Sequence, residues 1–535
     1  MTHISSEDSN ASPIVPRRAE FWVLVATILP SSMGFISTSG LDAASPALQT
    51  DLGIISADLF WIINIYALFL SALILVGGSL GDHYGRKRVF MFGIGLFTVV
   101  SFACGLAPNS DVLIGLRALQ GVGAALMIPG SLAILTVSFP PERRGQAIGT
   151  WSTFSAVTSV LGAPLGGWIA GQGESFWRAV FFINIPFGIV ALLVLLWYVP
   201  ESRDEEAPDK LDFAGTILAT LGLGGLTYGF LQAPSYGFDD PRILFSLIGG
   251  LAACIAFVIV EARSDHPMMP LGLFKSTTFS GANLLTLFLY GALRIVPFFL
   301  ILNLVQVQGY PQEIAGFTFL PFGIMLTLMG RWAGGLVDRI GSRIPLIIGP
   351  LITGAGFFLM SVPGLTNGVS DYWTTYFPGI MLTSIGMGIL VAPLTTTVMS
   401  AAPSHSSGTA SGINNAVSRT AGVLSIAIMG AVAILVFSNF LTARADDLRL
   451  SPDARAGLAR EANNLGDAQT PLALVRDVLD GRTNPMQMIL VQYQLQSSYI
   501  QTFRLVAIIG AVMAWVSALM AALLIKPHEI AGQSA

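Results

Sequence analysis

The sequence contains few charged residues. Asp, Glu, Lys and Arg make up 11% of its 535 residues, whereas hydrophobic side chains make up 53% and the mean hydropathy is +0.70. Soluble proteins carry about 25% charged residues, so most of this chain is expected to lie in lipid. A membrane β-barrel would show short segments of alternating polarity, and the long apolar runs of this chain indicate membrane-spanning helices instead.

Other scarcities exclude further classes of protein. The net charge is -4 and no basic face is interleaved with aromatic residues, which argues against a nucleic-acid partner. Cys104 and Cys254 lie in apolar runs and are expected to be packing residues rather than a disulfide or a metal pair. The sequence offers neither a nucleophile-base set nor a phosphate-binding Gly-Lys-Ser/Thr loop, so it predicts neither an enzyme nor an ATPase, and no cofactor or metal.

Fourteen apolar runs are long enough to cross a bilayer, which takes roughly 20 helical residues. An even number of spans places both chain termini on one side of the membrane. The runs lie at 21-42, 60-81, 88-107, 110-135, 147-170, 180-199, 212-231, 242-261, 278-305, 314-336, 344-363, 374-398, 411-437 and 503-525.

The distribution of basic residues predicts which side carries the termini. Most Lys and Arg residues fall in the loops and tails on the side of the termini, whereas the short loops of the other side carry only Arg178 and Arg242. This asymmetry predicts cytoplasmic termini. Residues 1-20 lack the apolar core of a cleavable signal, so the span beginning at Phe21 is expected to act as an uncleaved anchor in a plasma or inner membrane.

An internal repeat predicts two related halves. Gly-Ser-Leu-Gly-Asp82-His-Tyr-Gly85-Arg86 returns as Gly-Gly-Leu-Val-Asp338-Arg-Ile-Gly-Ser-Arg343, each at the cytoplasmic end of a span. Repeated halves around a midplane site are how alternating access is commonly built. The predicted organisation is a tail 1-20, a six-helix bundle 21-199, two inserted helices with loops 200-277, a second six-helix bundle 278-525 and a tail 526-535.

A long outer segment, roughly 438-501, separates the last two predicted spans. Its stretch 441-479 mixes leucine and alanine with balanced charge, which predicts short amphipathic helices at the membrane surface. A cap over the exit and an inert loop are both compatible with this pattern.

Further motifs carry a resemblance to a known family. Besides the loop at 78-87, they are Arg117-Ala-Leu-Gln120-Gly-Val-Gly, Gly162-Ala-Pro164-Leu-Gly166-Gly167, Trp177-Arg178-Ala-Val-Phe-Phe-Ile-Asn184-Ile-Pro186 and Leu211-Asp212-Phe-Ala-Gly215. With them the chain resembles the major facilitator superfamily, and within it the fourteen-helix drug:proton antiporters of the EmrB/QacA type. The resemblance implies an all-α polytopic fold of two six-helix bundles with two inserted helices, which rock about a central cavity.

The loop between the second and third spans is predicted to act as a gate. Gly85 allows a tight turn because it takes a positive φ at little cost, and Arg86 anchors the loop inside. The resemblance implies that Asp82 latches one state by contacting the other half, and that Asp338 and Arg343 do the same in the second copy. A simple positive-inside hairpin is the alternative.

Proton coupling is predicted to involve Arg117 and Asp42. Arg117 lies about seven residues into its span, roughly 10 Å deep, where a cation needs a partner. The resemblance implies a proton relay with an acid on the first helix. Alignment on Pro46 places Ser37 where the family has that acid, and Asp42 where it has an asparagine, near the predicted outer end of the span. A solvated carboxylate is the alternative for Asp42.

Arg294 is a second intramembrane cation. It lies about sixteen residues into the first helix of the second half, near mid-membrane. An unpaired cation there is costly, so we expect it to pair with Asp42 across the two halves or to await an anionic ligand. Packing against helix-end carbonyls or snorkelling is the alternative.

The helix at 147-170 and an apolar pocket complete the predicted machinery. Gly162, Pro164, Gly166 and Gly167 form a small-residue surface with a bend, which the resemblance assigns to antiport and which plain helix packing also explains. Side chains proposed to line a mostly apolar substrate cavity are Phe35, Trp61, Tyr66, Gln120, Trp151, Phe154, Tyr290, Arg294, Asn303 and Asn414.

The sequence therefore predicts a proton-coupled exporter of amphipathic small molecules that works by alternating access. The scarcity of intramembrane acids argues against dedicated cation export and leaves neutral, zwitterionic and anionic amphipaths open. An exporter of one endogenous metabolite or antibiotic is the first alternative, and a transporter-like membrane receptor is the second. Expected partners are the substrate, protons and lipid, with no obligatory protein partner because one chain contains both halves.

Overall fold

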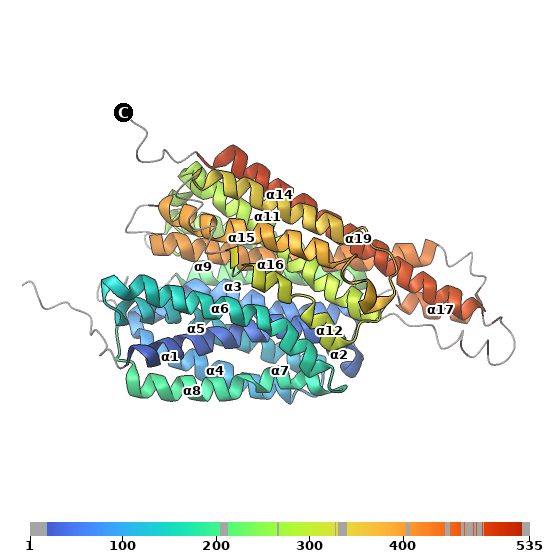
Figure 1. Cartoon of the computed structure of the whole chain (residues 1–535), viewed down its shortest axis with the longest axis horizontal. Helices are drawn as coiled ribbons and strands as arrows, with labels where there is room; N and C mark the ends of the chain where they lie inside the picture. The colour runs from blue at the N-terminus through green and yellow to red at the C-terminus, as the bar shows by residue number, and fades with distance from the viewer. Residues whose placement is uncertain are drawn as a thin grey trace, which may run out of the picture.

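The computed structural model is built of helices throughout its described part. It describes residues 19-203, 212-264, 267-326, 328-329, 340-402, 407-443, 450-461, 465, 475, 478, 484 and 486-526. Figure 1 shows two long helical layers side by side, with the first residues of α1 and the last of α19 at the same end of the molecule. The prediction of an all-α polytopic chain is confirmed.

The first half forms the layer coloured blue to teal. Its first span is continuous through a π-helical turn between α1 and α2, and α7 and α8 together form its last span. The elements are α1 (Glu20–Phe35), η1 (Ile36–Gly40), α2 (Leu41–Leu52), α3 (Ser56–Tyr84), α4 (Arg86–Gly105), α5 (Ser110–Ser138), α6 (Pro141–Ala170), η2 (Phe176–Arg178), α7 (Ala179–Phe182) and α8 (Asn184–Tyr198).

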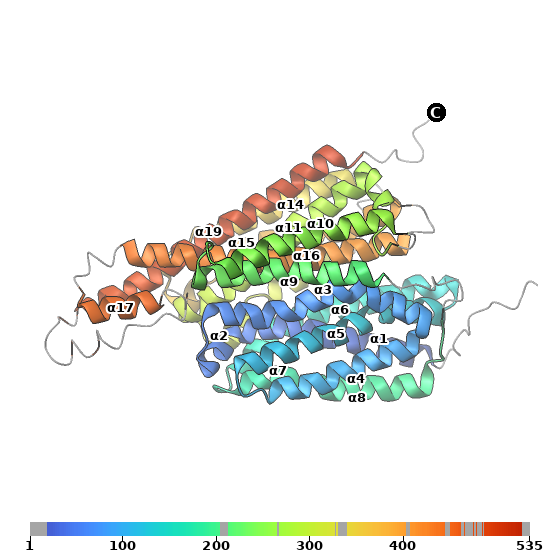
Figure 2. The same cartoon turned by 180° about the vertical axis from the view of Figure 1, so that it is seen from behind.

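Two further helices join this half to the second. α9 (Phe213–Tyr236) contacts both α3 and α16, while α10 (Pro241–Arg263) packs on α9, as Figure 2 shows. The second half consists of η3 (Leu271–Lys275), α11 (Thr277–Leu302), η4 (Asn303–Val307), α12 (Gln312–Phe317), α14 (Arg343–Met360), η5 (Gly368–Asp371), α15 (Phe377–Ser400), α16 (Ser407–Ala443), α17 (Pro452–Glu461) and α19 (Met486–Leu524).

Twelve helices in the described part are long and apolar enough to cross a membrane. They coincide with twelve of the fourteen predicted spans. The other two predicted spans, 147-170 and 314-336, fall on the shorter apolar helices Val157–Ala170, which is part of α6, and Gln312–Leu326, which ends beside residues outside the described part. The structure therefore shows a multi-span membrane protein with twelve candidate spans, and it does not show a count of fourteen.

The first span is longer than the sequence predicts. It runs from Glu20 to Leu52, ten residues beyond the predicted end at Asp42. Pro46 lies inside α2 without ending the helix. At 1.5 Å per residue the extension is about 15 Å, so Asp42 lies well inside the span and is only 8% exposed. The expectation that Asp42 lies near the outer end is therefore wrong.

The outer segment also contains more helix than predicted. α16 continues to Ala443 and α19 begins at Met486, so both extend into the predicted loop 438-501. Figures 1 and 2 show α17 beside these protruding ends, away from the main bundle. Ala454 and Leu458 of α17 are buried, whereas most of its other residues are exposed, so this short helix is amphipathic as predicted.

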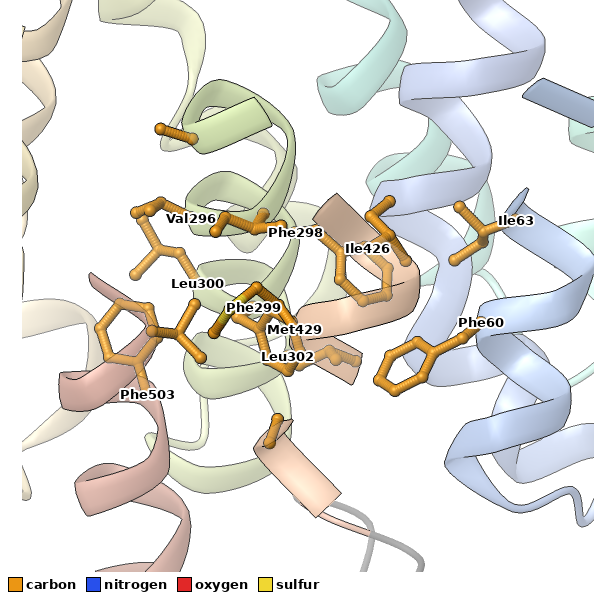
Figure 3. Packing of buried hydrophobic residues seen from close by; sticks show 14 of the residues in the cluster. Phe60, Ile63, Val296, Phe298, Phe299, Leu300, Leu302, Ile426, Met429 and Phe503 are labelled. Carbon is orange, nitrogen blue, oxygen red and sulfur yellow. The ribbon is translucent and has the colours of Figure 1, made fainter. Parts of the chain in front are cut away.

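An apolar cluster joins the two halves. Phe60 of α3 packs against Phe298 and Phe299 of α11, with ring centroids 5.7 and 5.8 Å apart. Ile426 and Met429 of α16 belong to the same cluster, and Figure 3 shows these side chains between the helices of the two halves. The cluster belongs to the end of the bundle that carries α2, since Phe60 lies in the first turn of α3 after the α2–α3 turn.

Candidate functional site

A buried ion pair connects the two halves. Arg294 of α11 donates to both carboxylate oxygens of Asp42 in α2, with 3.0 Å between Nη2 and Oδ1 and a second contact from Nη1 to Oδ2. The side chains are 22% and 11% exposed. This two-pronged geometry is the strongest that a guanidinium and a carboxylate form. The pairing expected between these two residues is present in the structure.

Other hydrogen bonds between the halves lie near the ion pair. Gln306 donates to Gln49 Oε1 at 3.3 Å, and Gln312 donates to the carbonyl of Ala43. Within the described residues, the side-chain hydrogen bonds between the halves involve only α2 and the first ten residues of α3 on the first half's side. Together with the Phe60 cluster, they hold the two halves closed at the α2 end.

Arg117 belongs to a separate polar cluster inside the first half. It is 1% exposed and donates to Gln120 Oε1 at 2.6 Å and to the carbonyl of Ile62 at 3.2 Å. Gln120 in turn donates to Ser101 at 2.7 Å, and the Arg117 guanidinium lies 4.3 Å from the ring centre of Tyr66. In the described part of the chain no carboxylate forms an ion pair with Arg117. Its interaction with Asp42 is electrostatic, without contact.

Ser37, at the position where the family has an acid, is fully buried. Its hydroxyl accepts a hydrogen bond from Asn184 Nδ2 at 2.9 Å, which joins the π-helical turn of the first span to α8. Asn184 belongs to the motif 177-186, so this motif contributes a contact that sequence reasoning missed. The same motif fixes the end of the first span, because Trp177 Nε1 donates to Asp51 at 2.8 Å.

The glycines of α6 allow two close approaches. A Cβ on Gly166 would lie 2.1 Å from the carbonyl oxygen of Gly40, and a Cβ on Gly162 would lie 2.0 Å from Ser39 Oγ. On the other side, a Cβ on Gly167 would meet the carbonyl of Gln312 at 2.7 Å. α6, with Pro164 buried in it, therefore lies between the first span and α12 of the other half.

A small cavity lies in the second half. Its volume is about 90 Å³, and it is lined mainly by polar side chains of α16 together with residues of α11 and α15. Two of the predicted cavity residues, Tyr290 and Asn414, line it, and Asn414 also donates to Asn283 at 3.1 Å and Thr286 at 2.8 Å.

The remaining predicted cavity residues are distributed along the bundle. Phe35 is half-buried in α1, and Trp61 lies 6.3 Å from the ring of Tyr228. Trp151 donates to Ser31 at 3.1 Å, whereas Phe154 is 53% exposed. Asn303 is fully buried and donates to Tyr376 at 2.8 Å. The structure does not gather these residues into one described cavity.

The loop after α3 is clasped by a residue that the sequence analysis did not consider, Glu201. Gly85 has φ of +108°, and a Cβ there would lie 2.8 Å from Glu201 Oε1. Glu201 accepts from the backbone of Lys87 at 3.0 Å and forms an ion pair with Arg88 at 3.5 Å, while the backbone of Arg86 donates to the Ser202 carbonyl at 2.8 Å. The sequence pattern that could have identified Glu201 is an acidic residue directly after a span, on the same side as a basic loop.

Of the other predicted gate residues, the structure describes the side chain of Arg343 but not those of Asp82 and Asp338. Asp82 lies in the last turn of α3, but its side chain is outside the described part, and so is Asp338. Arg343 begins α14 and donates to the carbonyl of Ala522 near the end of α19 at 2.5 Å. Arg343 therefore contacts a helix of its own half.

Two bundles of membrane-spanning helices, joined by a buried ion pair and close helix packing between them, define a membrane transporter. A profile of the Major Facilitator Superfamily matches residues 30-426. The chain belongs to this superfamily, whose members are transporters and not enzymes. The predicted resemblance to the superfamily is confirmed.

Individual relatives and structures agree with this assignment. The chain is 32% identical to the multidrug resistance protein Stp of Mycobacterium tuberculosis, over 78% of this chain and 76% of that protein. It is 31% identical to the tetracenomycin C resistance and export protein of Streptomyces glaucescens, over 80% and 79%. A crystal structure of a bacterial homolog of the human lysosomal transporter Spinster matches 95% of this chain and 97% of its own with a TM-score of 0.63 at 16% identity, which shows the shared fold.

Proposed function

We propose that the chain exports amphipathic small molecules in exchange for protons, as a fourteen-helix antiporter of the EmrB/QacA type with cytoplasmic termini. Relatives named for multidrug resistance and antibiotic export support the direction of transport. The two shorter apolar helices at the fifth and tenth predicted spans support the count of fourteen. The bias of basic residues supports the orientation.

The Asp42–Arg294 pair is the observation that carries the proposed mechanism. Asp42 is a carboxylate deep in a span, and it holds the two halves together at the α2 end. A proton on Asp42 removes its negative charge, so Arg294 loses its partner and the halves lose a tie. Gain or loss of this proton therefore changes how strongly the α2 end is held closed. A proton that biases the opening of one end is the kind of coupling that alternating access requires.

Arg117 contributes to proton coupling through its charge. It lies within electrostatic range of both Asp42 and Arg294, although it touches neither. Its positive charge attracts the Asp42 carboxylate and repels the Arg294 guanidinium. In this scheme the Glu201-bound loop with Gly85 and Arg86 is the gate at the opposite end, with Asp82, Asp338 and Arg343 as further gate residues. The glycine surface of α6 is the packing surface on which the halves rock.

The test is transport by purified protein in liposomes with an imposed pH gradient. Uptake of a panel of amphipathic dyes is followed in wild type, Asp42→Asn, Arg117→Ala and the control Asp240→Asn, whose carboxylate pairs locally with Arg242 at the surface. Gradient-dependent transport is expected in wild type and the control and is expected to be lost in the other two. Gradient-dependent transport that survives Asp42→Asn would contradict the proposed coupling.

A dedicated exporter of one compound remains the second candidate, favoured by the relative that is named for a single antibiotic. The dye panel separates the two functions. Several structurally unrelated dyes are transported by a multidrug pump, whereas a dedicated exporter moves none of them and responds only to its own compound. A receptor would bind ligand without moving it across the membrane.

A further inference from the structure

Two carboxyl groups meet where α9 begins and α10 ends. Asp212 directly precedes α9 and caps it, because its Oδ1 accepts from the backbone of Gly215 at 2.7 Å. Glu261 lies in the last turn of α10 and is only 2% exposed. Its Oε2 accepts from the backbone of Met269 at 2.9 Å. One oxygen of each carboxyl group is thus satisfied by a backbone N–H.

The other two oxygens of the pair border the same small space. Asp212 Oδ2 and Glu261 Oε1 are both buried, and neither has a hydrogen-bond donor among the described residues. A Cβ on Gly215 would lie 2.7 Å from each of these two oxygens. The two side chains are within hydrogen-bonding reach of each other. A hydrogen bond between two carboxyl groups requires a proton on one of them, because an ionised carboxylate only accepts.

The charged residues nearby in the described part of the chain do not compensate the pair. α9 contains no charged residue, and the basic residues of α10 and η3 at this end, Arg263 and Lys275, are exposed and form no ion pair with it. Residues 204-211 and 265-266 lie outside the described part. Two ionised carboxylates in one small space would repel each other and leave two buried oxygens without donors. A single proton between them removes one charge and satisfies both oxygens.

We propose that Asp212 and Glu261 share one proton, held between Oδ2 of the first and Oε1 of the second, and that this proton fastens the inserted helices to the second half. Met269, which Glu261 binds, belongs to the segment that leads through η3 into α11. In the same segment Met268 Sδ accepts from Thr216 of α9 at 3.6 Å. Loss of the proton leaves two facing negative charges, which push the ends of α9 and α10 apart and loosen this segment.

This proton site is distinct from the Asp42–Arg294 pair. The backbone of Lys526, two residues after α19, donates to Thr278 near the start of α11 at 3.3 Å, so α11 begins at the end of the bundle where α19 ends. Figure 1 shows that end beside the first residues of α1 and opposite α2. Neither the carboxyl pair nor its test depends on the proposed export function, because the proton is detected without transport.

The test is infrared difference spectroscopy of the full chain in lipid nanodiscs, which detects the C=O stretch of a protonated carboxyl group. Spectra of wild type, Asp212→Asn and Glu261→Gln are recorded at neutral pH in H2O and D2O. Subtraction of either variant from wild type is expected to leave one protonated carboxyl band that shifts in D2O. Each amide keeps the backbone hydrogen bond at its position and donates to the remaining carboxylate, so both variants are expected to fold.

Three further variants make the result specific. Asp240→Asn removes a surface carboxylate that pairs with Arg242 and is expected to leave the band unchanged. Gly215→Ala places a Cβ against both oxygens and is expected to shift the band. Gly224→Ala, on the same helix, adds a Cβ that meets nothing within 4 Å and is expected to match wild type. The same carboxyl region in wild type and in both amide variants would overturn the shared proton.

Hydrogen–deuterium exchange of the backbone around Met269 measures what the proton holds together. Protection is normalised to the intrinsic exchange rate at each pH. The protonated pair holds the segment at low pH and releases it as the pH rises, so wild type is expected to lose protection several-fold at alkaline pH. Asp212→Asn gives Glu261 a permanent donor and is expected to keep its protection at every pH. An equal loss in wild type and Asp212→Asn would overturn the fastening role of the proton.

Discussion

At the scale of single residues, the chain places its membrane-embedded charges differently from what the family pattern implies. Ser37 occupies the expected position of the acid and hydrogen-bonds to Asn184, whereas Asp42 lies five residues later and pairs with Arg294. The π-helical turn Ile36–Gly40 lies within this stretch, and the two side chains contact different helices, α8 for Ser37 and α11 for Asp42. The Asp42 carboxylate thus contacts the other half.

The ion pair predicts a particular pattern of stability. Arg294→Gln or Asp42→Asn alone leaves a buried charge without its partner, and each is expected to destabilise the protein by about 3 kcal/mol or less. The double variant removes both charges. Its loss of unfolding free energy is expected to be smaller than the sum of the losses in the two single variants. Thermal unfolding of the four proteins in detergent gives the double-mutant cycle. Additive losses would show that the two side chains do not interact in solution.

The loop after α3 predicts a steric effect with two parts. Gly85→Ala places a Cβ at a φ of +108° and against Glu201 Oε1 at 2.8 Å. The positive φ costs an alanine roughly 1–2 kcal/mol of folding free energy. The contact with Glu201 Oε1 strains the hydrogen bond between Glu201 and the backbone of Lys87. Gly85→Ala is expected to slow transport several-fold, and Glu201→Ala in the same protein is expected to restore only part of the rate.

The control for this prediction is a glycine on the neighbouring helix. Gly95→Ala in α4 adds a Cβ that meets nothing within 4 Å, and it is expected to transport like wild type. The same initial-rate measurement in liposomes serves all four proteins. A Gly85→Ala protein with the wild-type rate would show that the loop geometry is dispensable.

At the scale of elements, helix packing decides where the halves approach each other. A Cβ on Gly316 of α12 would lie 2.4 Å from the carbonyl oxygen of Ala163 in α6. Backbone atoms at such a contact cannot turn aside as a flexible side chain does. The absence of a Cβ at Gly316 therefore sets how closely α6 and α12 pack across the halves.

Gly316→Ala is accordingly expected to separate the halves at the α2 end. The enlarged opening makes a cysteine introduced at Gln306 react faster with a membrane-impermeant maleimide added from outside. Gly249→Ala on the exposed face of α10 adds a Cβ with no neighbour within 4 Å and is the matched control. Equal labelling of Gln306→Cys in both backgrounds would mean that this contact does not hold the end closed.

Elements were the part of this protein that the sequence predicted best. Long apolar runs gave twelve spans that the structure contains, because about 20 apolar residues have little alternative to a membrane helix. The ends were less accurate: the first span passes Pro46 and reaches Leu52, since a proline is tolerated where its neighbours satisfy the freed carbonyl. Packing partners such as Glu201 with Gly85 depend on long-range geometry that a single sequence does not display.

The same distinction applies to the candidate site. The pairing of Asp42 with Arg294 was predictable because a mid-membrane cation needs a counter-charge and acids are scarce. The placement of Asn303 against Tyr376, and of Gln120 against Ser101, was not predictable because buried polar residues are satisfied by whichever helix packs beside them.

At the scale of the whole molecule, the halves are tied at one end. The Asp42–Arg294 pair, the Gln49–Gln306 hydrogen bond and the Phe60 cluster all belong to the α2 end. Within this set only the ion pair contains an ionisable group, because amides and phenyl rings carry no charge that a proton could remove. In the proposed mechanism a proton on Asp42 weakens the ion pair alone. The apolar contacts then determine how much free energy separation of the halves at the α2 end still costs.

Spin labels on the two halves measure this opening directly. Ile55 follows α2 in the first half and Val369 lies in η5 of the second, and both are exposed. In the Ile55→Cys/Val369→Cys protein, the distance distribution is expected to shift to longer values as the pH falls, because protonated Asp42 no longer holds Arg294. Asp42→Asn in the same background is expected to show the long distances at every pH. A distribution that responds to pH in the Asp42→Asn protein would place the proton-sensitive group elsewhere in the molecule.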